Sequence, residues 1–258
     1  MIEQTIEVPT KDGPMKTFFI HPEDGGPFAP IVLFMDIWGI REELREIARR
    51  VSTVGYACLL PDFYHRQGDD IHTETYQPDG RMVSLHKMNK EEERKVYVPR
   101  AQLTGAMMMD DTAALLESID GHAAMRSGSV GSVGWCLGGW MVMAAAGNYP
   151  DRFQAGASLH GTMPISDKPD SPHLLVDKFQ GELYCGFGEL DHLTPPAMAE
   201  ELGKLLQPCS VKYTSRMHMG IEHGYALPDR DIYDAQSAAI DWGLIFAMWQ
   251  RQLGAAGT

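Results

Sequence analysis

Short apolar runs separated by helical segments constrain the fold of this chain more than any other feature of the sequence. The run Ile31–Met35 is continuous, too short for a helix, and bounded by Pro30 and Asp36. This pattern is typical of a strand that is buried on both faces of a parallel sheet. The next segment, Glu42–Val54, instead places its apolar residues at helical spacing. A strand followed by a helix is the unit from which parallel sheets are built.

The same alternation runs to the end of the chain. Further strands are predicted over residues 56–60, 129–135, 156–159, 182–187 and 211–214, and further helices over 103–119, 137–147, 197–206 and 233–249. Residues 5–8 and 15–20 are predicted to form a hairpin around Lys11-Asp12-Gly13. Strand–helix alternation favours a mostly parallel sheet with helices on both faces. No linker or repeat divides the sequence, so we expect residues 1–258 to form a single α/β domain.

Residues 62–99 interrupt this alternation. They are polar and rich in charge, most of all at Glu91–Lys95. A loop of this length is uncommon inside a compact domain unless it has a function, such as covering a site. Two interpretations therefore fit the sequence, a lid over a site and a partly helical surface excursion.

The net charge limits the partners that we expect, and the spacing of the cysteines bears on disulfides, zinc and the cell compartment. The formal net charge of −13 weighs against nucleic acid and anionic membrane surfaces as partners. The first residues contain no apolar signal region, and no apolar run reaches membrane-spanning length. The four cysteines lie far apart without a CxxC pair, which predicts free thiols rather than disulfides or a zinc site. We therefore expect a cytoplasmic protein.

A candidate nucleophile lies in Gly134-Trp135-Cys136-Leu137-Gly138-Gly139, where a predicted strand ends and a predicted helix begins. This is the G-x-nucleophile-x-G pattern with cysteine in place of serine, and its strained turn needs small flanking residues. The N-terminus of the helix would stabilise a Cys136 thiolate, and the backbone N–H of Leu137 would face an oxyanion. The alternative is a glycine-rich turn around an inert cysteine. The strand before, the helix after and the partners downstream favour the nucleophile.

An acid is expected after a late strand in this architecture. The strand over 182–187 is followed by Gly188-Glu189-Leu190-Asp191, so Glu189 and Asp191 both qualify by position. Such an acid accepts the Nδ1 proton of the histidine and holds the ring in the working tautomer. We prefer Asp191, on chain order and on the family spacing described below.

Three histidines are candidates for the base or for the pocket. His223 precedes Gly224, which lets the loop approach the site, whereas His218 lies between two methionines, which indicates packing. We therefore assign the base to His223. No carboxylate or third ligand follows at a metal-binding spacing, so we expect no metal. His160 ends another strand, at the sheet edge where ligands bind, and either lines the pocket or is a hydrogen-bonded structural histidine.

Taken together, these motifs resemble the dienelactone hydrolase family, whose members are carboxymethylenebutenolidase-like α/β-hydrolases. In chain order, the resemblance is carried by Met35–Ile40 (MDIWGI), Leu60–Tyr64 (LPDFY), Gly134–Gly139 (GWCLGG), Gly188–Asp191 (GELD) with Pro195, and His223–Tyr225 (HGY). It spans nearly the whole chain and is weakest between residues 66 and 100. It implies the α/β-hydrolase fold.

The resemblance also implies roles for individual residues. The implied catalytic triad is Cys136, Asp191 and His223. The implied oxyanion hole is formed by the backbone N–H groups of Ile37 and Leu137. Members of the family carry, after the third strand, a glutamate that interacts with the nucleophilic thiol, and this sequence has Asp36 there. Because aspartate is one methylene shorter, we expect direct activation of the cysteine by the histidine to carry more of the mechanism.

The family holds the carboxylate of its substrate with arginines. Arg230, which follows His223 closely, and Arg94, in the stretch between residues 66 and 100, are the candidates for that role here, although neither matches a family motif. Trp38 and His160 are expected to line the pocket or to support the residues that do.

The chemistry expected is cofactor-free hydrolysis of a small ester or lactone (EC 3.1.1.-). The Cys136 thiolate attacks the carbonyl, a thioester forms, and water activated by His223 releases the acid. A thiolate is itself a good leaving group, so the substrate must also have one, as an enol lactone does. Two other classes stay open: a catalytically silent relative that binds a small ligand, and a redox sensor that uses the Cys136 thiol.

Overall fold

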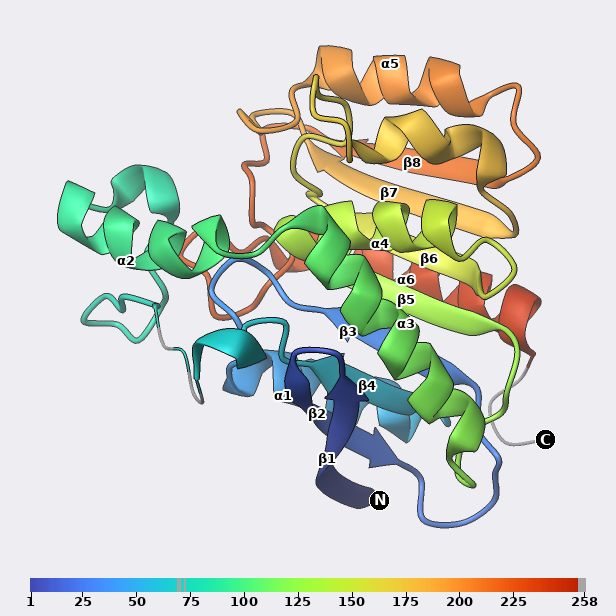
Figure 1. Cartoon of the computed structure of the whole chain (residues 1–258). Coiled ribbons are helices and arrows are strands. Elements are labelled where there is room, and N and C mark those ends of the chain that lie inside the picture. The colour runs from blue at the N-terminus through green and yellow to red at the C-terminus, as the bar shows by residue number, and fades with distance from the viewer. Residues whose placement is uncertain (69–70, 72, 255–258) are drawn as a thin grey trace.

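A sheet of eight strands runs through the computed structural model, which describes residues 1–68, 71 and 73–254 (Figure 1). The strands are β1 (Ile2–Thr10), β2 (Gly13–His21), β3 (Pro30–Phe34), β4 (Ala57–Pro61), β5 (Val130–Trp135), β6 (Phe153–Leu159), β7 (Glu182–Gly188) and β8 (Lys212–His218). Their order across the sheet is β1-β2-β4-β3-β5-β6-β7-β8. The pairs β1–β2 and β2–β4 are antiparallel, and the other neighbouring pairs are parallel.

Helices cover both faces of this sheet. The α-helices are α1 (Glu42–Thr53), α2 (Lys90–Ala101), α3 (Gly105–Gly121), α4 (Leu137–Asn148), α5 (Pro196–Leu206) and α6 (Ala235–Leu253), and short 3₁₀ helices are η1 (His65–Gln67), η2 (Leu85–Lys87) and η3 (Pro172–Lys178). In the view of Figure 1, α3, α4 and α5 lie in front of the sheet, and α1 and α6 lie behind it. The predicted mostly parallel sheet with helices on both faces is confirmed. No helix in the described part of the chain is long and apolar enough to cross a membrane.

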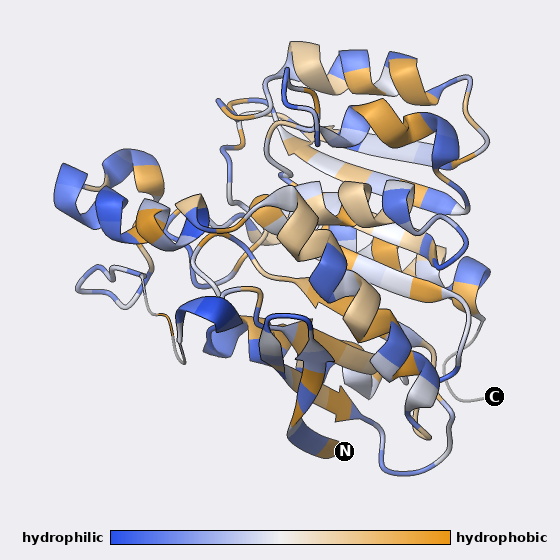
Figure 2. Cartoon of the chain, viewed as in Figure 1, coloured by the Kyte–Doolittle hydropathy of each residue, from blue (hydrophilic) through white to orange (hydrophobic). Residues whose placement is uncertain are grey.

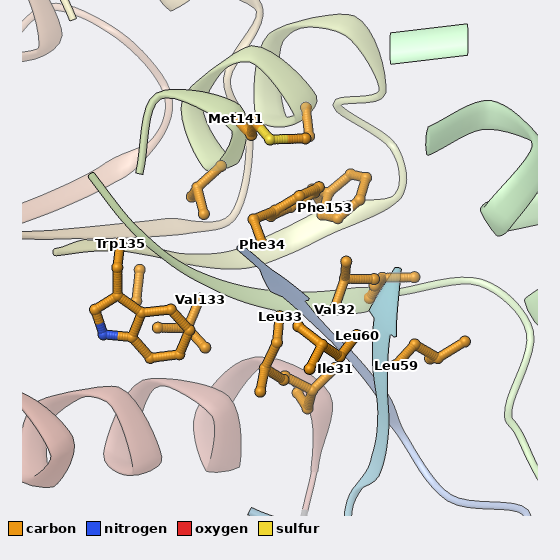
Figure 3. Packing of buried hydrophobic residues seen from close by; sticks show 14 of the residues in the cluster. Ile31, Val32, Leu33, Phe34, Leu59, Leu60, Val133, Trp135, Met141 and Phe153 are labelled. Atoms are coloured by element: carbon orange, nitrogen blue, oxygen red, sulfur yellow. The ribbon is translucent and has the colours of Figure 1, made fainter. Parts of the chain in front are cut away.

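The continuous apolar runs of the strands reflect burial on both sides of the sheet. Phe34 at the end of β3 and Phe153 at the start of β6 lie on the side where Met141 of α4 packs, with ring centroids 6.1 Å apart (Figure 3). Leu33 and Trp135 lie on the opposite side, and all five side chains are buried. Successive side chains of a strand point to opposite faces, so a strand covered by helices on both sides must be apolar throughout.

The predicted bounds of the last strand are wrong. The prediction over residues 211–214 is too short, because β8 continues to His218. The strand lies at the edge of the sheet and is largely exposed, so its residues are mostly polar and give little hydrophobic signal. His218 therefore ends β8 rather than following it.

The segment that interrupts the alternation is partly helical. It contains η1 and η2 and most of α2, whose start is capped by Asn89: the side-chain oxygen accepts from the backbone N–H of Glu92 at 3.0 Å, and the Glu92 side chain accepts from the Asn89 N–H at 2.9 Å. Helix α2 is polar over most of its surface (Figure 2) and buries only Val96 and Pro99. It projects from the body of the molecule in Figure 1.

Truncation of Phe153 tests the packing between the sheet and α4. Phe153→Ala should lower the free energy of unfolding by about 3–5 kcal/mol, because it removes a buried ring and leaves a cavity. Urea unfolding followed by circular dichroism measures this change. Leu174→Ala is the matched control, since that side chain is 53% exposed and its loss should change stability by about 0.5 kcal/mol or less. Equal effects of the two substitutions would contradict this account of the core.

Candidate active site

Cys136 occupies a strained turn between β5 and α4. Its backbone has φ 57° and ψ −114°, a conformation that non-glycine residues rarely adopt. The turn is possible only because the flanking residues are small: a Cβ on Gly134 would lie 2.2 Å from the carbonyl oxygen of Gly138, and a Cβ on Gly138 would lie 2.1 Å from the carbonyl oxygen of Phe34. The strain is held by the Cys136 N–H donating to Leu159 and by its carbonyl accepting from Thr162, both at 3.1 Å.

Two residues with backbone N–H groups lie near the cysteine, at the contact between Gly138 and the end of β3. Leu137 is the first residue of α4, and the first N–H groups of a helix have no partner inside it. Ile37 follows the end of β3, against which Gly138 packs. The Ile37 N–H donates to no acceptor within residues 1–68, 71 and 73–254, whereas its carbonyl accepts from the Tyr64 hydroxyl at 2.8 Å. Two free donors therefore lie at the start of α4 and at the end of β3.

His223 is hydrogen-bonded to one of the two candidate acids. Its Nδ1 lies 2.7 Å from Oδ2 of Asp191, and the other Asp191 oxygen accepts from the backbone N–H groups of Leu193 and Thr194 at 2.8 and 3.1 Å. Glu189 instead accepts from the N–H of Gly220 at 2.7 Å. Of the two carboxylates, Asp191 is thus the one that can orient the imidazole.

The charge state of His223 depends on Cys136. Burial of the ring opposes protonation, but the charge of the Cys136 thiolate and the hydrogen bond with Asp191 outweigh it and raise the pKa of His223 to about 10. In the described part of the chain, Nε2 of His223 has no hydrogen bond of normal geometry.

Asp36 is directed toward other partners than the thiol. It is fully buried, and its Oδ1 accepts from the backbone N–H of Trp38 at 3.1 Å and from Nη1 of Arg41 at 2.9 Å. Among the residues that the structure describes, Oδ2 of Asp36 has no partner, and no hydrogen bond joins Asp36 to Cys136.

Arg230 presents two unused donors close to these residues. It is 2% exposed, and its guanidinium lies over the ring of Trp38, with Cζ 4.1 Å from the ring centroid. Nη2 donates to the hydroxyl of Ser84 at 3.4 Å, whereas Nε and Nη1 have no acceptor in the described residues. Burial lowers the pKa of Arg230, although the charges of Asp36 and Cys136 oppose that effect. A buried cation with free N–H groups has the chemistry to accept an anion.

His160 packs directly against the base. Its ring centroid lies 5.0 Å from that of His223 and 5.4 Å from that of Tyr225, in edge-to-face arrangements. It is fully buried, and neither ring nitrogen has a hydrogen-bond partner in the described chain, so it is not a hydrogen-bonded structural histidine. Burial and the charges of His223 and Arg230 hold the pKa of His160 well below its ordinary value, so the ring is neutral beside a charged one.

His218 belongs to a separate buried network. Its Nε2 lies 2.8 Å from Oδ1 of Asp241 in α6, and the hydroxyls of Tyr184 and Tyr225 donate to the same carboxylate at 2.5 and 2.6 Å. Because Tyr225 lies two residues after His223, this network anchors the loop that carries the base. Sequence reasoning missed Asp241, since an aspartate within a helix has no local mark of such a role.

An apolar cluster covers the cysteine. Cys136, Ile37 and Trp38 pack with residues from the excursion between β4 and α3, which are Met82 and Val96 with Leu85 and Met88 around them. Cys136 is only 3% exposed beneath this cover. Sequence reasoning had not singled out these four residues, because their segment is otherwise polar.

Within the described ranges, no group of three or more His, Cys, Asp or Glu side chains is arranged to hold a metal ion.

The fold and the position of this site define an α/β-hydrolase. The sequence model of the dienelactone hydrolase family matches residues 15–253, and the chain belongs to that family. The crystal structure titled as a putative dienelactone hydrolase from Klebsiella pneumoniae superposes with a TM-score of 0.82 at 18% identity, over 97% of this chain and 98% of that one.

Curated relatives match along nearly the full length. A Synechocystis protein named "Putative carboxymethylenebutenolidase" is 26% identical over 253 residues, which cover 96% of each chain. A Methylorubrum extorquens protein of the same name is 25% identical over 99% of this chain and 83% of its own. A Bradyrhizobium protein named "Probable 2-oxo-3-(5-oxofuran-2-ylidene)propanoate lactonase" is 23% identical over 95% of this chain and 93% of its own.

The raised pKa of His223 can be measured directly. We expect the imidazole to stay protonated at pH 8, where an ordinary histidine is neutral, and to lose its proton near pH 10. In Cys136→Ala this pKa should fall, because the thiolate charge that raises it is gone while burial still opposes protonation. ¹⁵N NMR of histidine-labelled protein reports the ring state. An unchanged His223 titration in Cys136→Ala would show that the two groups are not coupled.

Proposed function

We propose that this protein hydrolyses small esters or lactones, with Cys136 as nucleophile, His223 as base and Asp191 as the acid that orients it. The observation that carries the proposal is the 2.7 Å hydrogen bond between His223 and Asp191, in a site where His223 is electrostatically coupled to a strained cysteine at the start of a helix. Family membership supports a hydrolase of this kind.

In the first step, the Cys136 thiolate attacks the carbonyl carbon. The backbone N–H groups of Ile37 and Leu137 are the donors for the oxyanion that forms, and they are free to do so. When the tetrahedral intermediate collapses, the C–O bond breaks, and the imidazolium of His223 gives its proton to the departing oxygen. The products of this step are an alcohol or enol and a thioester on Cys136.

In the second step, water hydrolyses the thioester. Neutral His223 takes a proton from the water, the resulting hydroxide attacks the thioester carbonyl, and the C–S bond breaks. The acid leaves, and the thiolate–imidazolium pair is restored. Asp191 holds Nδ1 throughout, so that Nε2 faces the reacting groups.

The substrate that suits this site has a good leaving group and a negative charge. A thiolate leaves more readily than an alkoxide, so collapse toward products favours enol or aryl esters. Arg230 offers two buried N–H groups without an acceptor, which a substrate carboxylate would satisfy. The name of the Bradyrhizobium relative joins both features, an unsaturated lactone and a propanoate.

We further propose that residues 62–99 act as a lid. Met82, Leu85, Met88 and Val96 pack with Cys136 and its neighbours, so a substrate can reach the sulfur only if this cover moves. Helix α2, which contributes Val96 to this cover, buries only two of its residues.

Substitution of the nucleophile and base tests the reaction. Wild type should hydrolyse at least one member of a panel of aryl esters, enol lactones and thioesters, and Cys136→Ala and His223→Ala should each lower kcat by at least about 1,000-fold. Steady-state kinetics on folded protein, checked by circular dichroism, measures this. Retained turnover in Cys136→Ala would reject the nucleophile. Absence of turnover in wild type would favour the ligand-binding or redox alternatives.

The role of Arg230 is tested by comparing charged and neutral substrates. In Arg230→Gln, KM for an aryl ester that carries a carboxylate should rise by about 10- to 100-fold, because a charge-assisted hydrogen bond is lost. KM for the matched uncharged ester should change little. Equal effects on both esters would mean that Arg230 supports the site without binding the anion.

A further inference from the structure

Arg41 lies buried between two carboxylates on different loops. Its side chain is 4% exposed, and it is the N-cap residue of α1, where its carbonyl accepts from the N–H of Leu44. Nη1 donates to Asp36 at 2.9 Å, Nε donates to Oδ2 of Asp229, and Nη2 lies 3.3 Å from Oδ1 of Asp229. The planar guanidinium therefore uses two different edges at once, which a lysine ammonium cannot reproduce.

On one side, Arg41 determines the shape of the loop that carries Ile37. Oδ1 of Asp36 accepts from Arg41 and from the backbone N–H of Trp38, and the Asp36 carbonyl accepts from the N–H of Gly39 at 3.2 Å. These bonds close a tight turn around Ile37, whose carbonyl is held by Tyr64. The direction of the Ile37 N–H thus depends on a carboxylate that Arg41 keeps in place.

On the other side, Arg41 reaches the loop that carries the base and Arg230. Asp229 precedes Arg230, and its carbonyl accepts from the N–H of Met82 at 2.7 Å. Arg230 in turn lies over Trp38. The turn at residues 36–39, the loop at residues 223–234 and the cover from the excursion therefore meet at one ion-pair cluster.

Two carboxylates and two guanidinium groups meet in this cluster, and Glu43 of α1 lies near enough to interact with Arg41 and Asp229. Asp36 and Asp229 are paired with Arg41, and Arg230 lies near enough for its charge to be felt by both carboxylates. Burial works against the charge of Arg41, but the two carboxylates hold its pKa above the ordinary value, so it stays charged. Removing one member would leave a buried charge without its partner, so the geometry of the whole group depends on Arg41.

We propose that Arg41 is a positioning residue for the oxyanion hole. By bridging Asp36 and Asp229, it directs the Ile37 N–H toward the position of the oxyanion. The same bridge holds the turn at residues 36–39 against the loop that carries His223. The inference rests on the proposed function, since it assigns Ile37 as an oxyanion donor. Arg41 touches neither the nucleophile nor the base, and it acts through the backbone of the turn.

The test distinguishes an effect on the oxyanion hole from an effect on the Cys136 thiolate. Hemithioacetal formation by a small aldehyde such as butanal needs both the thiolate and the oxyanion donors, whereas alkylation of Cys136 by iodoacetamide needs only the thiolate. We would measure kcat for p-nitrophenyl acetate, the inhibition constant of butanal, and the pH dependence of alkylation, by peptide mass spectrometry. The variants are Arg41→Lys and Asp229→Asn, with Arg50→Lys as the control, because Arg50 makes an exposed ion pair on α1.

In Arg41→Lys, we expect kcat to fall by about 10- to 100-fold and the inhibition constant of butanal to rise by a similar factor, somewhat less than the loss of a whole oxyanion donor. The pH dependence of alkylation should stay as in wild type. Asp229→Asn, which keeps the shape of the side chain, should shift both quantities in the same direction and decides the matter if Arg41→Lys does not fold. Arg50→Lys should match wild type.

Two results would overturn the proposal. If the variants lose thermal stability while kcat and butanal inhibition stay within about twofold of wild type, Arg41 serves only the fold. If the alkylation profile shifts enough to account for the loss of kcat, Arg41 acts on the thiolate rather than on the oxyanion hole. Failure of the proposed function is a distinct result: wild type would not turn over p-nitrophenyl acetate, whereas the protection of Cys136 from alkylation by bound butanal would still report on Arg41.

Discussion

The contact between the start of α4 and the end of β3 is the constraint on which the rest of the site depends. With Gly138 seated against the carbonyl oxygen of Phe34, the helix can begin directly at the sheet edge, and Cys136 is forced into its strained conformation. The same contact brings the residues that follow β3 next to the first residues of α4, and Ile37 packs in one cluster with Cys136. The strain, of order 1–3 kcal/mol, persists because the packing of strand against helix leaves the backbone no alternative.

The remaining parts of the site reach Cys136 on long loops, and buried ionic contacts hold these loops. Asp241 fixes the loop at residues 223–234 through Tyr225, Asp191 fixes the ring of His223, and Arg41 joins this loop to the turn at residues 36–39. Buried charged groups of this kind are costly unless they are paired, so the pairs that they form favour one arrangement of the loops. A rigid frame of this sort suits a site in which N–H groups must already point at a charge that appears only during the reaction.

Local chemistry made part of the site predictable. A cysteine between glycines at a strand-to-helix junction can be recognised in the sequence, because the turn requires small neighbours. Candidates for the acid and the histidine follow from chain order, because both are expected after the late strands. Asp191 and Glu189 lie in one short turn. The sequence favours Asp191 by chain order and family spacing, and in the structure it is Asp191, not Glu189, that is hydrogen-bonded to His223. The polar edge strand β8 was underestimated because an exposed strand has no need of apolar residues.

The sequence by itself determined the alternation of strands and helices, the mostly parallel sheet and the position of the strained cysteine, because these depend on local patterns of apolar and small residues. Only the tertiary structure decided which charges pair across the loops, that Arg230 stacks on Trp38 with two donors free, and that Met82 and Val96 cover the sulfur. These contacts join residues far apart in the chain, and a single arginine or methionine in a loop has no local feature that reveals its partner. Burial and charge pairing are properties of the folded arrangement, and so they appear only when the chain is folded.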